Sequence, residues 1–264
     1  MGADSCPPVG GGEVAAVGSL AAVTASYVDL SDPPGRALVV VAHPDDIDFG
    51  MAGTVAALTK AGTEVIYAIC TSGEAGPPED MDRVELAALR QAEQRAAAAA
   101  VGVTDVRFLG LPDGHLVADL DLRRTIAGVI REVRPDLVLQ PSPERRYDRI
   151  YASHPDHLAV GEATMAAVYP DARNPHAHPS LLLQGLQPHS VPEVWIVGLE
   201  PLDLFVDITD VFDQKVAALS SHASQVGWIE DLPRFLRTNS AALTREKGLP
   251  DGRLTEGFRR VVTT

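Results

Sequence analysis

The sequence predicts an α/β protein: an open, doubly wound, mostly parallel sheet with helices on both faces. Two observations support this fold class. Continuous apolar runs of strand length recur along the chain, and segments of helical composition separate them. A strand buried on both faces of a sheet is apolar at every position, and a helical crossover makes the strands that it joins parallel. We therefore expect any active site at the carboxyl ends of the strands.

Strands and helices alternate from residue 37 onward. The apolar runs that we interpret as strands cover residues 37–42, 64–70, 105–111, 136–141, 193–198 and 204–208. The segments that we interpret as helices cover residues 50–62, 82–102, 122–134, 154–169 and 210–225. Gly62 and Gly102 end two of these helices and Pro135 closes a third, as such residues commonly do. The alternation predicts a Rossmann-like arrangement.

The N-terminal segment differs in composition from the rest. Residues 1–35 are rich in Gly, Ala and Pro, and we expect an irregular leader packed on a single domain that covers residues 36–264. No Lys or Arg precedes Arg36, which is wrong for the basic start of a signal peptide. Cys6 and Cys70 form neither a disulfide framework nor a Cys-x-x-Cys pair, so we expect unpaired thiols and a cytoplasmic protein.

The charge balance limits the class of partner. A net charge of −14 argues against binding to nucleic acid or to an anionic membrane, because both require a basic surface. No apolar run approaches the roughly 20 residues of a membrane-spanning helix. A small-molecule partner remains, and a homo-oligomer stays open.

Two similar polar clusters follow predicted strands. The sequence "HPDD" covers residues 43–46, after the first strand, and "HPDH" covers residues 154–157, after the fourth. A His-Pro-Asp turn can be a helix cap, with the carboxylate accepting helix N–H groups. Two such clusters at strand ends favour a metal site, because two histidines and one carboxylate with an open position suit catalytic zinc.

Several segments together carry a family resemblance. They are "AHPDD", "LRQAEQRAAAAAVGV", "FLGLPDG", "HPDH", "KVAALSSHASQ" and "EGFRRV". With them the chain resembles the PIG-L/LmbE-type zinc-dependent N-deacetylases, which act mostly on N-acetylglucosaminyl compounds. The resemblance implies a metal-dependent hydrolase that removes an N-acetyl or longer N-acyl group from a glucosamine-type amino sugar. The substrate would be a small glycoconjugate, such as a precursor of a glycopeptide antibiotic or of a thiol cofactor.

The resemblance also implies residue roles. His43, Asp46 and His157 would be the metal ligands, with zinc as the metal and Fe²⁺ as a substitute. Asp45, beside the metal, would be the general base. Zinc lowers the pKa of a bound water toward about 7, and a neighbouring carboxylate can take the proton.

Further roles concern the second cluster and the substrate. His154 would stabilise the oxyanion and protonate the leaving amine, with Asp156 orienting His154 and raising its pKa. Arg90 resembles a substrate-facing arginine braced by Glu93, although a helix arginine is commonly solvated. Asp113 in "LPDG" would contact a sugar hydroxyl or serve only the turn.

The chain departs from the family pattern near both clusters. Ile47 stands where many relatives have Glu, and Ala152 stands where some have Tyr, with Tyr151 one residue earlier. Tyr147 and Arg149 are candidates to replace that tyrosine.

The proline-rich segment 169–193 contains the apolar run "LLLQGL". We expect a lid in which Leu182 contacts an apolar part of the substrate; a loop packed on the core is the alternative. The three histidines of this segment have no carboxylate or thiolate partner in the sequence pattern, which argues against a second metal. His222 matches a family pattern without a role that we can derive, and core hydrogen bonding is favoured.

Two alternatives to the deacetylase stay open. An Fe(II)-dependent oxygenase uses two histidines and one carboxylate, but it would give Asp45 no role. A non-catalytic sugar-binding module would not need both the presumed base and the presumed acid.

Overall fold

The computed structural model describes residues 26–150 and 153–263, and within them seven strands form one sheet. Their order is β3-β2-β1-β4-β5-β7-β6. The strands are β1 (Arg36–Val41), β2 (Glu64–Ile69), β3 (Asp105–Phe108), β4 (Leu137–Pro141), β5 (Glu193–Val197), β6 (Leu204–Asp207) and β7 (Thr255–Val262). The first five pair in parallel, and β7 runs antiparallel between β5 and β6. The predicted fold class is confirmed.

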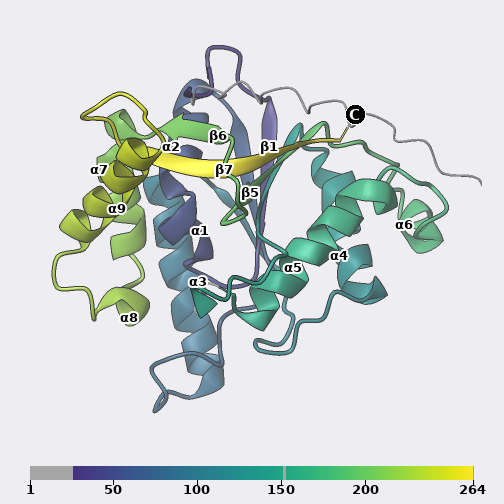
Figure 1. Cartoon of the computed structure of the whole chain (residues 1–264). Coiled ribbons are helices and arrows are strands. Elements are labelled where there is room, and N and C mark those ends of the chain that lie inside the picture. Colours follow the sequence, from purple (N-terminus) through teal and green to yellow (C-terminus); the bar gives the residue numbers. More distant parts are fainter. Residues whose placement is uncertain (1–25, 151–152, 264) are drawn as a thin grey trace, which may run out of the picture.

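Helices cover both faces of the sheet (Figure 1). On one side lie α1 (Asp46–Gly50), α2 (Ala52–Ala61), α3 (Arg83–Ala100), α7 (Phe212–Ser220) and α9 (Leu232–Glu246). On the other lie α4 (Leu120–Val133) and α5 (Pro155–Ala166). Alternate residues of β1 enter the two cores: Val39 and Val41 belong to the first, Leu38 and Val40 to the second. This double burial explains why the strand is apolar at every position.

Three predicted helices are interrupted. The helix expected over residues 50–62 is divided at Met51, which leaves helical geometry at φ −135°. The helix expected over 154–169 passes into a π-helical turn, η2 (Ala167–Asp171), which contains Pro170. The segment 210–225 divides into η3 (Thr209–Val211), α7 and α8 (Ala223–Val226). The break between α7 and α8 falls at His222. The buried ring of this residue hydrogen bonds to Asp48.

The described part of the leader packs on β6. Tyr27 forms a parallel bridge with Phe205, and the backbone N–H of Val28 donates to the Phe205 carbonyl. Most of the predicted leader, Cys6 included, lies outside the described residues. In the part of the chain that the structure describes, no helix has the length and apolar character needed to cross a bilayer.

Segment 169–193, the leucine-rich segment that contains the run "LLLQGL", packs on α4. Its short helix α6 (Pro179–Leu183) places Leu181, 3% exposed, in the second core against Gly128. Leu182 is only partly buried, and Leu183 is 90% exposed.

Polar groups fix this segment to the same helix. Arg131 of α4, itself buried, donates to the carbonyls of Asp171, Ala172 and Asn174. The Asp171 carboxylate accepts two hydrogen bonds from Arg123 at 2.8 and 3.0 Å, and Nε2 of His178 lies 3.0 Å away. Hydrogen bonds and ion pairs therefore attach segment 169–193 to α4.

Candidate metal centre

Two loops at the carboxyl edge of the sheet carry the polar clusters. Residues 43–46 lead from β1 into α1, while His154 caps α5 and His157 lies in its first turn, after β4. β1 and β4 are neighbours in the sheet although β2 and β3 lie between them in sequence. This is the point at which the strand order reverses, where ligands of open α/β sheets bind.

The donor atoms of His43, Asp46 and His157 converge. Nδ1 of His43 lies 3.1 Å from Nε2 of His157 and 3.6 Å from Oδ2 of Asp46. Oδ1 of Asp46 lies 2.9 Å from Nε2 of His157. Asp46 also accepts a hydrogen bond from the backbone N–H of His43 at 2.8 Å, which fixes its carboxylate. The structure thus brings together the three residues expected to hold a metal.

The other nitrogen of His43 faces two carboxylates. Nε2 lies 3.0 Å from Oδ1 of Asp113 and 3.3 Å from Oδ2 of Asp156. Asp156 is fully buried and accepts hydrogen bonds from the backbone N–H groups of Gly114 and Leu116. A metal-binding histidine commonly donates its second N–H to a carboxylate in this way, which orients the ring.

The carboxylate of Asp156 faces His43, and the contact of Asp156 with His154 is made by its backbone N–H, which donates to Nδ1 of His154. The loop that follows β3 holds this carboxylate in place by two backbone hydrogen bonds. Asp113 likewise contacts His43, and its second oxygen accepts a hydrogen bond from the Ala75 N–H.

Two groups of side chains could hold a cation: His43 with Asp46 and His157, or His43 with His154 and Asp156. The carboxylate of Asp156 already accepts two backbone hydrogen bonds and faces His43 Nε2. In the first group, Nδ1 of His43 would bind the cation, and Nε2 would keep its contacts with the carboxylates of Asp113 and Asp156. The donor chemistry fits a divalent metal at this first group.

The charges of the cluster also favour a cation. Burial opposes protonation of His43, but hydrogen bonds to Asp113, Asp156 and Asp46 outweigh it and raise its pKa to about 12. Burial opposes ionisation of Asp46, but the charge of His157 and hydrogen bonds from both histidines hold its pKa well below the ordinary value. The carboxylates therefore hold positive charge at this point, and a metal ion competes with protons for the same imidazole nitrogens.

Asp45 is held in an uncommon backbone conformation beside the donors. Its φ of 84° lies in the left-handed region, which costs a non-glycine residue of the order of 1–3 kcal/mol. Its backbone N–H donates to Oε1 of Gln94 at 2.8 Å, and Nη2 of Arg90 lies 3.3 Å from its carboxylate. Burial and the charge of Asp46 raise the pKa of Asp45 to about 7, although Arg90 opposes this.

Arg90 holds the loops around Asp45. Its guanidinium, 5% exposed, donates to the carbonyls of Gly73 and Pro44, each at 2.8 Å. Glu93 does not follow the expected bracing role, since its carboxylate accepts two hydrogen bonds from Ser224.

A buried network behind Asp45 was not predicted from the sequence. Gln94 donates from Nε2 to Asp48 at 2.9 Å, and Nε2 of His222 lies 2.8 Å from the same oxygen. All three side chains are fully buried. Asp48 lies two residues after Asp46, so a second carboxylate on the same short helix was the available signal. The expected core hydrogen bonding of His222 agrees with this contact.

His154 stands at the open side of the cluster. Its Nδ1 accepts the backbone N–H of Asp156 at 3.2 Å, so a neutral ring carries its proton on Nε2. Its ring centroid lies 5.0 Å from that of His43 and 5.6 Å from that of His157. Desolvation and the charges of the two neighbouring histidines lower its pKa, against the expected increase.

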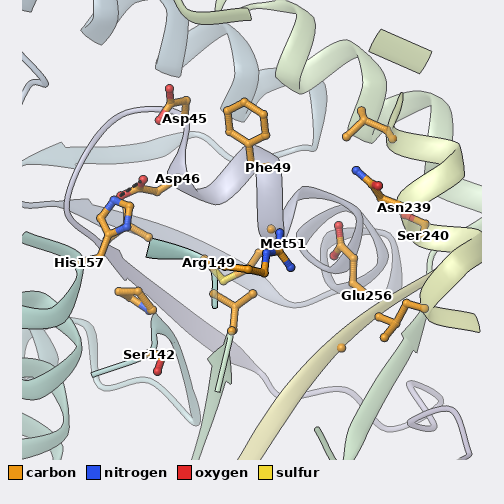
Figure 2. Close-up of a pocket in the computed structure, with 18 of the residues that line it drawn as sticks. Asp45, Asp46, Phe49, Met51, Ser142, Arg149, His157, Asn239, Ser240 and Glu256 are labelled. Carbon is orange, nitrogen blue, oxygen red and sulfur yellow. Dashed lines mark ion pairs between the residues drawn. The ribbon is translucent and has the colours of Figure 1, made fainter. Parts of the chain in front are cut away.

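Two cavities meet at the donor residues. Asp45, Asp46 and His157 line both of them. The smaller, about 350 Å³, is also lined by Arg90, Asp113 and His154 and by residues 75–77. The larger, about 680 Å³, opens toward α9 and β7, and Figure 2 shows Phe49 and Met51 between the donors and Asn239.

No part of segment 169–193 lines either of these two cavities, so they do not support the lid interpretation of Leu182, which stays a prediction. In this segment Leu181 and Val191 are buried in the core that α4 shares. Tyr147 is 85% exposed, whereas Arg149 lines the larger cavity. Tyr151 and Ala152 lie outside the described residues.

Comparisons with known proteins agree with the geometry. The family model of PIG-L, the GlcNAc-PI de-N-acetylases, matches residues 38–168, which include all three metal-donor residues. Diacetylchitobiose deacetylase of Thermococcus kodakarensis is 35% identical over 191 residues, 72% of this chain and 70% of that protein.

Solved structures repeat the fold. N,N'-diacetylchitobiose deacetylase from Pyrococcus horikoshii, in complex with an inhibitor, matches with a TM-score of 0.79 and 32% identity over 89% of this chain and 87% of that chain. GalB, the 4-carboxy-2-hydroxymuconate hydratase from Pseudomonas putida, matches with a TM-score of 0.70 and 26% identity over 87% and 97%. Because a deacetylase and a hydratase share this fold, the fold alone does not determine the reaction. The family is nevertheless shown by the sequence: this chain belongs to the PIG-L/LmbE family.

Proposed function

We propose that this protein is a zinc-dependent N-deacetylase that hydrolyses the amide of an N-acylated glucosamine-type sugar in a small conjugate. The observation that carries the proposal is the arrangement of Asp45 beside the converging atoms of His43, Asp46 and His157. The activities of the named deacetylase relatives support the substrate class.

In this proposal His43, Asp46 and His157 hold the metal. A bound zinc ion supplies Lewis acidity and lowers the pKa of a water in its open position. Asp45 takes the proton of the attacking water. Gln94 holds its backbone N–H, and Arg90 contacts its carboxylate.

His154 supplies the donor on the opposite side. Its Nε2 proton is available because Nδ1 accepts from the backbone. We propose that this N–H stabilises the developing oxyanion, and that the leaving nitrogen receives the proton that Asp45 took from the water. Asp113 and Asp156 act through His43, whose ring they orient.

We propose that the sugar occupies the smaller cavity. Most of the residues that line it are ionisable, and Arg90, Asp113 and His154 are among them. Hydroxyl groups can hydrogen bond to such a wall, whereas the larger cavity offers mainly apolar atoms.

The test measures both products. Chelated protein reloaded with zinc, under nitrogen, is given N,N'-diacetylchitobiose and a panel of N-acetylglucosaminides. Equal amounts of acetate and free amine are expected. An absolute need for oxygen would support the Fe(II) oxygenase, and binding without product on every substrate would support a sugar-binding module; either result refutes the proposal.

A further inference from the structure

The metal donors separate two cavities of different chemistry. Asp45, Asp46 and His157 line both, so a bond cleaved at these residues has one cavity on each side. The smaller cavity is lined mostly by ionisable residues, and it reaches to residues 75–77 and His154. A substrate whose scissile bond lies at the donors therefore extends in two directions.

The larger cavity is long and mainly apolar. It runs between α1, β5, β7 and α9, from the donors to Asn239 and Ser240 (Figure 2). The apolar side chains of its wall include Phe49, Met51, Val197, Trp228, Phe235 and Leu243. The methyl of an acetyl group would leave most of its 680 Å³ to water.

Its buried charges are already paired. Lys215 and Glu256 are 2% and 5% exposed, and they form an ion pair with each other. Lys215 also donates to the Phe49 carbonyl at 3.0 Å, and Glu256 accepts the N–H groups of Gly53 and Thr54. These partners use the hydrogen-bonding capacity of the pair. The wall also contains Ser142, Glu144, Arg146 and Arg149, but most of its surface is apolar.

Exposed aromatic side chains continue the apolar wall to the surface. Trp228 is 71% exposed and Phe235 37%, and their rings contact each other edge to face. Phe49, also 37% exposed, lies on the donor side. Large apolar side chains that gather at an open cavity indicate an apolar ligand group.

We propose that the larger cavity is an acyl-chain subsite and that the preferred substrate is an amino sugar with an N-acyl chain longer than acetyl. This inference rests on the proposed function. The amide carbon lies at the donors, and the sugar on its nitrogen side takes the smaller cavity. The acyl chain, on the carbon side, then enters the apolar cavity.

The reaction is balanced with water alone. Oxygen of water bonds to the acyl carbon, the carbon–nitrogen bond breaks, and the nitrogen takes a proton. The products are a medium-chain carboxylate and a free amino sugar. Each methylene buried from water is worth about fourfold in affinity, so full burial of six further carbons sets an upper limit of about four thousandfold on the gain in kcat/KM.

The test uses two series of substrates with zinc-loaded protein. The first holds a methyl glucosaminide constant and varies the N-acyl group over acetyl, butyryl, hexanoyl and octanoyl. The second holds N-acetyl constant and lengthens the alkyl group at the anomeric oxygen. We expect kcat/KM to rise with acyl length by more than tenfold from acetyl to octanoyl and to change little in the second series.

A pair of variants adds a matched control. Asn239→Trp places a large side chain into the cavity from the exposed face of α9. Thr238→Trp adds the same side chain at the next position, which is also exposed and does not line the cavity. We expect Asn239→Trp to lower the octanoyl-to-acetyl ratio of kcat/KM at least tenfold and Thr238→Trp to leave it unchanged.

The outcomes separate the two proposals. Cleavage of the acetyl substrate with falling kcat/KM for longer acyl chains would overturn the acyl subsite and leave the deacetylase intact. A rise in the second series alone would assign the cavity to the aglycone and also overturn it. Failure to cleave any member of either series would refute the proposed function itself.

Discussion

Replacement of Gln94 by Met tests the link between a buried network and the proposed base. Gln94 is fully buried on α3, accepts the N–H of Asp45 and donates to Asp48. Methionine has a similar length and cannot replace either hydrogen bond. The N–H of Asp45 loses its partner, whereas the Asp48 oxygen keeps His222. We therefore expect the free energy of unfolding to fall by about 1–3 kcal/mol.

The effect on catalysis has a separate origin. The left-handed conformation of Asp45 persists only while its surroundings hold it, and Gln94 supplies the hydrogen bond at its N–H. A displacement of about 1 Å at a catalytic group can cost about a hundredfold. We therefore expect kcat of amide hydrolysis to fall by about that factor, while the zinc content of folded protein is retained.

The assay combines initial rates, zinc content by mass spectrometry and urea unfolding. Gln91→Met is the matched control, because Gln91 lies on the same helix and hydrogen bonds to Ser72 at 2.7 Å. It should change kcat by less than about twofold. A Gln94→Met protein that turns over like the wild type would refute the reasoning that this network positions Asp45.

Three more predictions follow from the geometry. His157→Ala should lose most bound zinc, whereas Asp45→Asn should keep it and lose about 10²–10⁴-fold in turnover; loss of zinc in Asp45→Asn alone would reverse the assignment of ligand and base. Burial opposes ionisation of Asp171, but its arginine and histidine partners outweigh it and lower its pKa below the ordinary 3.8. Its stabilising contribution is therefore present above about pH 4 and is lost as the pH falls through the lower folded value; urea midpoints should depend less on acid in Asp171→Asn, and equal pH dependence would contradict this. Leu181→Ala should cost about 2–5 kcal/mol of unfolding free energy and Leu183→Ala less than about 0.5, measured by urea unfolding; equal effects would contradict the burial difference.

The sequence predicted the parts of the site that depend on strand ends. The loops after β1 and β4 had to meet at one edge, because parallel neighbouring strands end together. That constraint is enough to bring His43, Asp46 and His157 into one region without knowledge of any side-chain rotamer. The same reasoning gives the parallel part of the sheet.

Contacts that depend on side-chain direction could not be predicted in this way. Asp113 and Asp156 both turned toward His43, since the loop after β3 presents its backbone N–H groups to Asp156. Gln94 is one of several polar residues on α3, and only the packing of that helix against α1 makes it a partner of Asp45.

The strand β7 and the leucine-rich segment show two other limits. β7 contains Arg259 and Arg260, and its half-exposed pattern differs from the continuous apolar runs that indicate buried strands. In segment 169–193 the apolar run did signal burial. The segment packs on α4 and not at the active site. The apolar run alone does not determine which part of the fold it packs against.

Titration of zinc into chelated protein tests the central claim most directly. Amine release from an N-acetylglucosaminide is measured at each addition, in wild type and in His157→Ala. We expect wild-type activity to rise in proportion to added zinc and to stop rising at about one equivalent per chain, while the variant stays inactive over the same range. Full activity in the chelated protein, or an unchanged titration curve in His157→Ala, would contradict it.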